Sequence, residues 1–100
     1  MAVAENIRVA VDFEHYFYWS SLTQSIRFYA VDRGTRIRCA VTRTALQELA
    51  GSLELLQPAD LERVFEQRRQ AVEVVAARKL VAGQFQPDAT ILVRAVDLNP

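Results

Sequence analysis

The sequence contains a single cysteine, Cys39, so no disulfide can form within one chain. A lone thiol is typical of proteins kept in a reducing cytoplasm, which is where we expect this protein to reside. Glycine and proline are scarce as well, with three of each among 100 residues. The sequence has no glycine-rich loop of the kind that cradles phosphates, and it has no internal repeat. A disulfide-stabilised scaffold and a phosphate-binding loop are therefore both excluded.

Long apolar runs are also missing near the start of the chain. Glu5, Arg8, Asp12 and Glu14 interrupt every apolar stretch of the first 19 residues. Neither a signal-peptide core nor a membrane span of roughly 20 apolar residues can be drawn there. We therefore expect no membrane association.

Net charge is absent too, because 12 basic side chains balance 12 acidic ones. This balance argues against a protein that binds nucleic acid through overall positive charge. The arginines are unevenly spread, however. Five of them lie between residues 27 and 43, where Asp32 is the only acidic residue. The sequence thus predicts a basic patch on a neutral chain.

The strongest pattern that is present predicts one long amphipathic helix from Pro58 to Gly83. Proline suits a first helical position, and glycine suits the residue after a helix end. At about 100° per residue, one face of this helix gathers apolar side chains. They belong to Leu61, Val64, Phe65, Val72, Val75 and Ala76. Such a face must be covered, so we expect the rest of the chain to pack against it.

Four residues of the same helix break the simple pattern. Arg68 and Lys79 project near the centre of the apolar face, where we expect their methylene stems to cover apolar surface while the charges reach water. The alternative is that this face meets an acidic partner or ligand. Val74 and Val81 lie on the other side of the helix and indicate a second contact surface, hence self-association.

Three segments alternate apolar and polar residues, as half-buried strands do. They are residues 7–13, 25–31 and 35–41. The turn Asp32-Arg33-Gly34 joins the second and third segments into a hairpin, because glycine tolerates positive φ. The side chains expected to point inward from the hairpin are those of Ile26, Phe28, Ala30, Ile37, Cys39 and Val41.

The remaining segments complete the predicted fold. Residues 42–50 read as a short helix with Thr44 and Gln47 as a capping box and Gly51 at its end. A connector, Leu53 to Leu56, covers the core, and residues 89–96 form a last strand, apolar enough on both faces to lie inside a sheet. This order predicts an α+β fold in one domain over residues 1–100: a small antiparallel sheet of about four strands with both helices on one face.

Several of these residues also form a longer pattern. It runs G-x-x-x-x-C-x-V, then AL, then F-x-x-x-R-x-x-V-E-x-x-A, and is carried by Gly34, Cys39, Ala45, Leu46, Phe65, Arg69, Val72, Glu73 and Ala76. Over roughly residues 25–97 the chain resembles a family of short bacterial proteins known only as domain of unknown function 1488. The resemblance implies a hairpin, two helices, a closing strand and a bacterial origin. It brings no activity, and it leaves out the aromatic run from His15 to Trp19.

A catalytic reading of the sequence rests on Cys39 and His15. A thiol nucleophile needs a nearby imidazole or a positive field to become a thiolate. Because Cys39 alternates inward with Ile37 and Val41, a buried core thiol is the favoured interpretation. Metal-ligand spacings and a G-x-S-x-G element are both missing. We therefore expect no enzymatic activity, no metal and no cofactor.

Two further groups could bind a partner. Arg36 and Arg38 share one strand face and Arg27 belongs to the strand opposite, so three guanidinium groups could converge on phosphates or on an acidic protein. Sheet faces also carry arginine without any ligand. Arg69 and Glu73, four apart, form either a solvated ion pair or a pair that orients a ligand beside the hairpin.

The aromatic residues Tyr16, Tyr18 and Trp19 could stack nucleic-acid bases. The favoured interpretation is that they cap the core or are buried in a dimer, since tyrosine and tryptophan suit half-wet interfaces. The sequence thus predicts a non-catalytic interaction or regulatory module of the bacterial cytoplasm, working as a homodimer or with an unknown protein partner. The alternative is a nucleic-acid-binding accessory protein that uses the arginine-rich hairpin.

Overall fold

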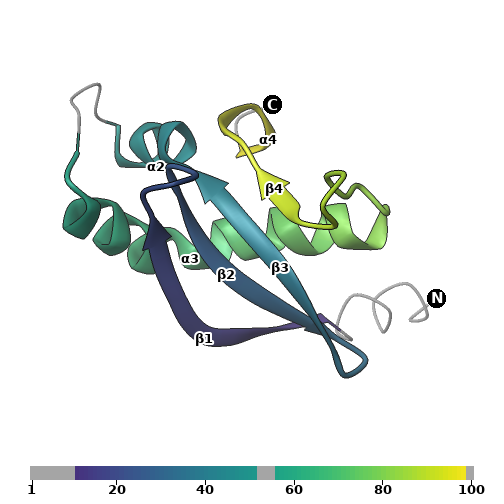
Figure 1. Cartoon of the computed structure of the whole chain (residues 1–100). Coiled ribbons are helices and arrows are strands. Elements are labelled where there is room, and N and C mark those ends of the chain that lie inside the picture. Colours follow the sequence, from purple (N-terminus) through teal and green to yellow (C-terminus); the bar gives the residue numbers. More distant parts are fainter. Residues whose placement is uncertain (1–10, 52–55, 99–100) are drawn as a thin grey trace.

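The computed structural model describes residues 11–51 and 56–98. Its elements are β1 (Val11–Ser20), β2 (Ser25–Asp32), β3 (Thr35–Thr42), α2 (Arg43–Ala50), α3 (Pro58–Val81), β4 (Ile91–Val93) and α4 (Ala95–Leu98). The four strands form one sheet in the order β1-β2-β3-β4. The long helix α3 lies across one face of that sheet (Figure 1). The predicted α+β fold is therefore confirmed.

The sheet is mixed rather than wholly antiparallel, because β4 pairs with β3 in parallel. The chain crosses through α3 between these two strands, and a helical crossover returns the chain in the same direction. The expectation that residues 89–96 lie inside the sheet was wrong, since β4 has three residues and forms an edge. Its apolar character has another cause: Ile91 and Val93 enter the core, while Leu92 lines a groove on the opposite face.

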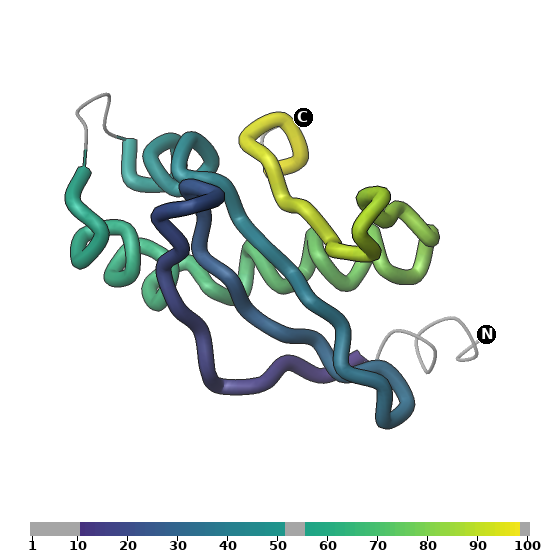
Figure 2. Tube along the Cα trace, viewed as in Figure 1, coloured from purple at the N-terminus to yellow at the C-terminus, as the bar shows by residue number. Residues whose placement is uncertain are grey.

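Strand β1 extends through the aromatic run, which the sequence pattern did not assign to a strand. Residues 7–10 of the predicted first strand lie outside the described residues. Phe13 pairs with Ala30 and Phe17 pairs with Phe28, so three residues of β1 stand opposite one residue of β2. This bulge bends the strand, as the trace shows (Figure 2).

The predicted hairpin of β2 and β3 is confirmed. Arg33 and Gly34 both have positive φ, 51° and 83°, as a two-residue turn of the twisted hairpin type requires. Phe28 and Cys39 face each other across the strands and are fully or almost fully buried. The alternation of the sequence therefore predicted the faces of both strands correctly.

The N-cap of helix α2 (Arg43–Ala50) lies two residues before the predicted cap, Thr44. Thr42 is the N-cap, and its Oγ1 accepts a hydrogen bond from the backbone N–H of Ala45 at 3.1 Å. The capping box of Thr44 and Gln47 was wrong, because Thr44 already lies inside the helix. Gly51 ends the helix with a φ of 68°. Of the predicted connector, Leu53 and Leu55 lie outside the described residues.

Helix α3 places Leu61, Phe65, Val72 and Ala76 in the core, as predicted. The backbone leaves helical geometry at Arg68, with φ −112° and ψ 16°, and this side chain is exposed instead of projecting over the core. The predicted position of Arg68 over the apolar face was wrong because helical spacing does not carry through the kink, but its side chain does reach water as expected.

We expected the charge of Lys79 to reach water or to meet an external acidic partner, and both predictions were wrong. Its side chain is 13% exposed, and its Nζ lies 2.9 Å from Oδ2 of Asp97 in α4. The acidic group that Lys79 meets is thus supplied by the chain itself.

Aromatic rings join the two layers at the centre of the core. Phe65 of α3 packs against Phe28 and Phe17, with ring centroids 5.3 and 4.9 Å away. All three rings lie on the helix side of the sheet. This leaves the other sheet face to side chains of a different kind.

Candidate interaction face of the sheet

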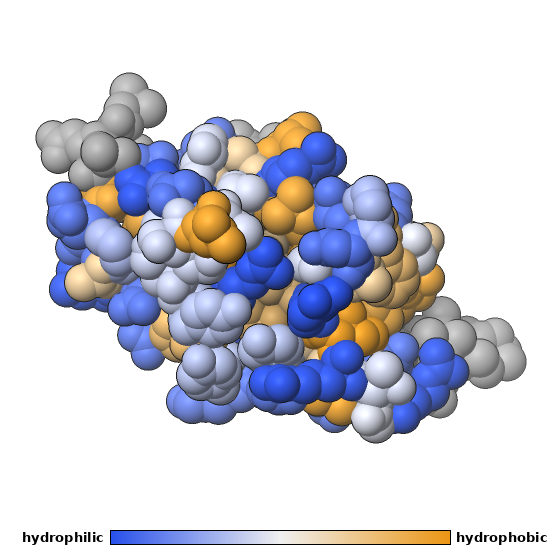
Figure 3. Space-filling model, in the orientation of Figure 1, coloured by the Kyte–Doolittle hydropathy of each residue, from blue (hydrophilic) through white to orange (hydrophobic). Residues whose placement is uncertain are grey.

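The sheet face that points away from α3 carries the outward side chains of β1, β2 and β3. The register places Tyr18 opposite Arg27, and Tyr29 opposite Arg38. Among the described elements, no helix covers this open face. In the space-filling view it is mostly hydrophilic or intermediate, with scattered hydrophobic residues (Figure 3). We therefore searched it first for a binding site.

Three tyrosines form a tyrosine patch on the open face: Tyr16, Tyr18 and Tyr29. The ring centroid of Tyr16 lies 5.9 Å from that of Tyr18 and 6.4 Å from that of Tyr29. Tyr16 is 58% exposed and Tyr18 is 38% exposed. Burial, and then the neighbouring Tyr18, raise the pKa of Tyr29. The patch is thus an aromatic surface with two exposed rings, those of Tyr16 and Tyr18.

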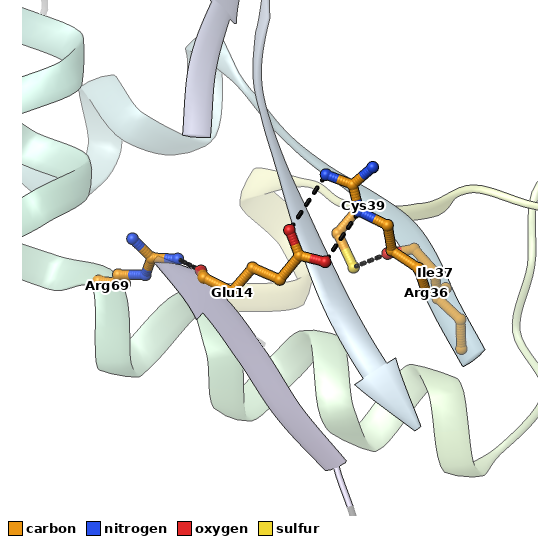
Figure 4. Close-up of polar contacts among 5 residues, drawn as sticks. All are labelled: Glu14, Arg36, Ile37, Cys39 and Arg69. Atoms are coloured by element: carbon orange, nitrogen blue, oxygen red, sulfur yellow. Dashed lines mark hydrogen bonds and ion pairs between the residues drawn. The ribbon is translucent and has the colours of Figure 1, made fainter. Parts of the chain in front are cut away.

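Arg36 and Glu14 hold one side of the tyrosine patch. The Arg36 guanidinium carbon lies 3.7 Å from the ring centroid of Tyr29. Glu14 accepts two hydrogen bonds from the same group, at 2.8 Å from Nε and 3.0 Å from Nη2 (Figure 4). A bidentate pair of this kind fixes orientation as well as charge. The charge of Arg36 is thus compensated within the chain.

The three arginines predicted to converge share the open face but have separate neighbours. Arg38 donates from Nη2 to the backbone carbonyl of Asp88, and Arg36 is paired with Glu14. The side chain of Arg27 makes no hydrogen bond or ion pair within the described parts of the chain, and its charge acts on the Asp88 carboxylate. The Thr90 hydroxyl and backbone N–H, and then the charges of Arg38 and Arg27, lower the pKa of the Asp88 carboxyl.

Arg27 borders a depression of about 440 Å³ on the open face. We call it the polar groove. Its walls and floor come from β2, β3, β4 and the loop before β4: Thr23, Ser25, Arg27, Ala40, Thr42, Gln86, Pro87, Asp88, Thr90 and Leu92. No local sequence pattern predicts this groove, because its two halves are about 50 residues apart in the chain and meet only through the parallel pairing of β3 and β4.

Arg69 and Glu73 lie on the other side of β1 and do not belong to the open face. Nε of Arg69 donates to Oε2 of Glu73 at 2.7 Å. The other two nitrogens donate to the backbone carbonyls of His15, at 2.9 Å, and Glu14 (Figure 4). Both carbonyls belong to the bulge of β1. The structure therefore places this pair in a support for the bulge rather than in a ligand groove.

Trp19 is also turned away from the tyrosine patch. It is half-buried, packs against the core, and has the Arg43 guanidinium 5.2 Å from its ring. Strand alternation explains this separation, since Tyr18 and Trp19 must point to opposite faces. Of the three aromatic residues predicted to bind a partner, only Tyr16 and Tyr18 share a surface.

Cys39 and His15 are not brought together as a nucleophile and a base. Cys39 is 1% exposed, and burial raises the pKa of its thiol to about 12. Its Sγ lies 3.7 Å from the carbonyl oxygen of Ile37 (Figure 4). His15 is exposed in the bulge. At neutral pH the thiol is therefore protonated and shielded.

The described segments were also searched for metal sites and membrane-crossing helices. Within them, no three side chains of histidine, cysteine, aspartate or glutamate are grouped so that they could share a metal ion. Within residues 11–51 and 56–98, no helix has the length and hydrophobicity that a membrane crossing requires.

The side of α3 that faces away from the core carries exposed apolar residues. Val74 and Val81 are 50% and 54% exposed. Together with Ala77, Arg78 and Ala82 they line an apolar depression of about 710 Å³, which we call the α3 groove. It lies apart from the tyrosine patch, because the two surfaces are borne by different layers of the fold.

Comparison with known families decides where the chain belongs. The profile of a family described as "Protein of unknown function (DUF1488)" matches residues 11–93. The chain belongs to the DUF1488 family. The resemblance found in the sequence is thereby confirmed. The match begins at residue 11, so the family pattern includes the aromatic run that the resemblance had left out.

A solved DUF1488 structure gives the same fold. It is the crystal structure of a protein of unknown function from Shewanella loihica PV-4, which is 24% identical to this chain. The TM-score is 0.79, and the superposition covers 84% of this chain and 91% of the other. No curated protein matches this DUF1488 chain.

Proposed function

We propose that this DUF1488 chain is a non-catalytic interaction module that forms a homodimer through the tyrosine patch. The observation that carries the proposal is the group formed by exposed Tyr16 and Tyr18 with half-buried Tyr29, on a sheet face that no described helix covers. Tyrosine is enriched at protein interfaces, where a large rigid ring contributes contact area at little cost in conformational entropy.

Charge favours a second copy of the chain as the partner. Arg36, the cation in contact with the patch, is already paired with Glu14. Two copies related by a two-fold axis can therefore bring their tyrosine patches together without burying an unpaired Arg36 charge.

The non-catalytic part of the proposal is supported by the state of the one thiol. Cys39 is buried with a raised pKa, and His15 lies exposed in the bulge. The single cysteine also suits a reducing compartment, so we propose the bacterial cytoplasm as the location.

The homodimer is tested by sedimentation velocity over a range of concentrations. We expect a concentration-dependent dimer, and we expect the double variant Tyr16→Thr, Tyr18→Thr to raise the dissociation constant by at least about tenfold, as loss of a central aromatic contact does. Threonine keeps the strand propensity of both positions. A wild-type chain that stays monomeric at every concentration would contradict the proposal.

The matched control lies on the α3 groove. Val74→Ser with Val81→Ser removes exposed apolar surface from the other layer and should leave the dissociation constant unchanged. If this variant separates the dimer while the tyrosine variant does not, the interface is the α3 groove and the tyrosine patch is not the contact surface.

A second candidate, binding of single-stranded nucleic acid, is favoured by one arrangement. Tyr18 stands directly across from Arg27, the arginine without a partner in the described chain. An aromatic ring beside a free guanidinium can stack a base and contact a phosphate. This candidate predicts that a fluorescent oligouridine binds at low salt, that binding weakens as salt rises, and that Arg27→Gln reduces it. Unchanged anisotropy at low salt would eliminate it.

A further inference from the structure

We propose that the polar groove binds a small monocarboxylate that also carries a hydrogen-bond donor, either a hydroxyl or an ammonium group. This inference concerns a different part of the open face from the dimer contact and does not require dimerisation. It rests on one cation, a hydroxyl-lined floor and one carboxylate that face the same depression.

The cation is Arg27. It lies half-buried at the groove wall, and no carboxylate or carbonyl of the described residues accepts a hydrogen bond from it. Arg38, the nearest comparable group on the neighbouring strand, is engaged by the carbonyl of Asp88. A guanidinium presents parallel N–H donors that match the two oxygens of a carboxylate. Arg27 therefore supplies the anion-binding position.

Hydroxyl groups form the floor of the groove. Ser25 and Thr90 are only 2% and 3% exposed, which is unusual for polar residues at the bottom of an open depression. The Ser25 and Thr23 hydroxyls share a hydrogen bond of 2.7 Å. The buried Thr90 hydroxyl approaches the Asp88 carboxylate, yet it makes no hydrogen bond of normal geometry within the described chain. Its interaction with the Asp88 carboxylate ties the floor of the groove to its wall.

Asp88 decides which anions are accepted. Its Oδ1 accepts the backbone N–H of Thr90 at 3.1 Å, and this bond holds the carboxylate at the groove wall. A ligand with two negative charges, such as a phosphate, would face this carboxylate as well as Arg27 and would be disfavoured. A monocarboxylate carries a single negative charge and is repelled less, and a donor elsewhere on the ligand can bind Asp88. The volume of about 440 Å³ suits a small molecule of this kind.

Titration of the ¹⁵N-labelled full chain with three matched compounds tests the proposal. Propionate, L-lactate and L-alanine share a three-carbon carboxylate but carry no donor, a hydroxyl and an ammonium group, respectively. We expect lactate or alanine to shift the amide signals of Ser25, Arg27, Thr42 and Thr90 saturably. The expected dissociation constant is at least about threefold lower than that of propionate, and inorganic phosphate should bind more weakly still.

Variants separate the roles of the two charged groups. Arg27→Gln should weaken binding at least about tenfold, whereas Asp88→Asn should remove the difference between lactate and propionate and should improve phosphate binding. Asparagine keeps an oxygen that can accept the Thr90 N–H. Arg33→Gln, at the exposed hairpin turn, is the matched control and should leave all four affinities unchanged.

Three results would overturn the proposal. They are the absence of saturable shifts with lactate and alanine up to about 100 mM, tighter binding of phosphate than of lactate to the wild-type chain, and retention of binding by a folded Arg27→Gln variant. The amide spectrum of the variant without ligand shows whether it is folded. If Arg27→Gln does not fold, the Asp88→Asn variant still tests the proposal. An unchanged preference of that variant for lactate over propionate would contradict the role of Asp88 in binding the donor group of the ligand.

Discussion

Arg69 donates hydrogen bonds to backbone carbonyls that the bulge of β1 leaves without partners in the sheet. Three residues of β1 stand opposite one residue of β2, so backbone groups in the bulge lose their partners in the ladder. Arg69 donates to two of the freed carbonyls, of Glu14 and His15, while Glu73 holds its Nε. Arginine suits this role because its donors form a fixed planar fork that can reach both carbonyls at once.

We expect Arg69→Gln to lower the free energy of unfolding by about 2 to 3 kcal/mol, because charge-assisted hydrogen bonds to the bulge are lost. Urea denaturation measures this change. The control is Arg63→Gln on the same helix, whose ion pair with Asp60 is largely exposed and should be worth less than about 0.5 kcal/mol. Equal effects of the two substitutions would show that Arg69 is also only a surface cation.

The buried thiol of Cys39 makes the stability of the fold depend on pH in the alkaline range. In the unfolded chain the thiol titrates near pH 9.0, whereas burial in the folded chain raises its pKa to about 12. Between these values the unfolded chain releases a proton that the folded chain keeps, so stability falls as pH rises. We expect the wild type to lose stability from pH 9 to pH 10.5 at a rate that Cys39→Ala does not share. Thermal unfolding of both proteins over this range measures the difference, and parallel curves would contradict it.

At the scale of elements, the short helix α4 is attached to α3 by Asp97. This carboxylate meets Nζ of Lys79 at 2.9 Å and also accepts the backbone N–H of Arg94 at 2.8 Å. Burial alone would raise the pKa of Asp97, but these two hydrogen bonds and the charges of Lys79 and Arg94 lower it. One side chain thus caps α4 and docks it on the long helix.

We expect Asp97→Asn to lower the free energy of unfolding at pH 7 by about 2 kcal/mol, because Lys79 is left largely buried without an anion. The folded pKa of Asp97 lies below its ordinary value, so the contribution is present above pH 3.8 and disappears as pH falls further. Urea denaturation at pH 7 and at pH 3 should therefore show a large difference from the wild type at pH 7 and a smaller one at pH 3. A difference that does not shrink in acid would argue against the charge pair.

At the scale of the whole molecule, two layers share one aromatic centre. Phe65 is fully buried and contacts rings of two different strands. Phe65 is the only aromatic residue of α3, so the helix contributes a single ring to this aromatic centre. The packing of α3 against the sheet therefore depends strongly on Phe65.

We expect Phe65→Ala to cost about 3 to 5 kcal/mol, which is most of the stability of a domain of this size. Circular dichroism at 25 °C should show a largely unfolded chain. Val74→Ala on the exposed side of the same helix is the matched control and should change stability by less than about 0.5 kcal/mol. A folded Phe65→Ala protein with a small loss of stability would contradict this account of the core.

The elements followed from the sequence because their patterns are local. Alternation fixed the inner face of the hairpin, and helical spacing fixed the buried face of α3, since each strand or helix repeats its geometry from residue to residue. The same reasoning failed where geometry departs from the repeat. The kink at Arg68 and the bulge of β1 each interrupted a period, and nothing in the neighbouring residues announced either one.

The sequence by itself determined the α+β class, the hairpin, the extent of the long helix and the burial of Cys39. Only the tertiary structure decided that Arg36 is neutralised by Glu14, that Arg69 supports the bulge, and that Arg27 borders a groove with Asp88. The physical reason is that hydrophobic periodicity depends on neighbours in the chain, whereas the partner of a charge depends on residues about 20 to 60 positions away, whose approach is set by strand register and the crossover of α3.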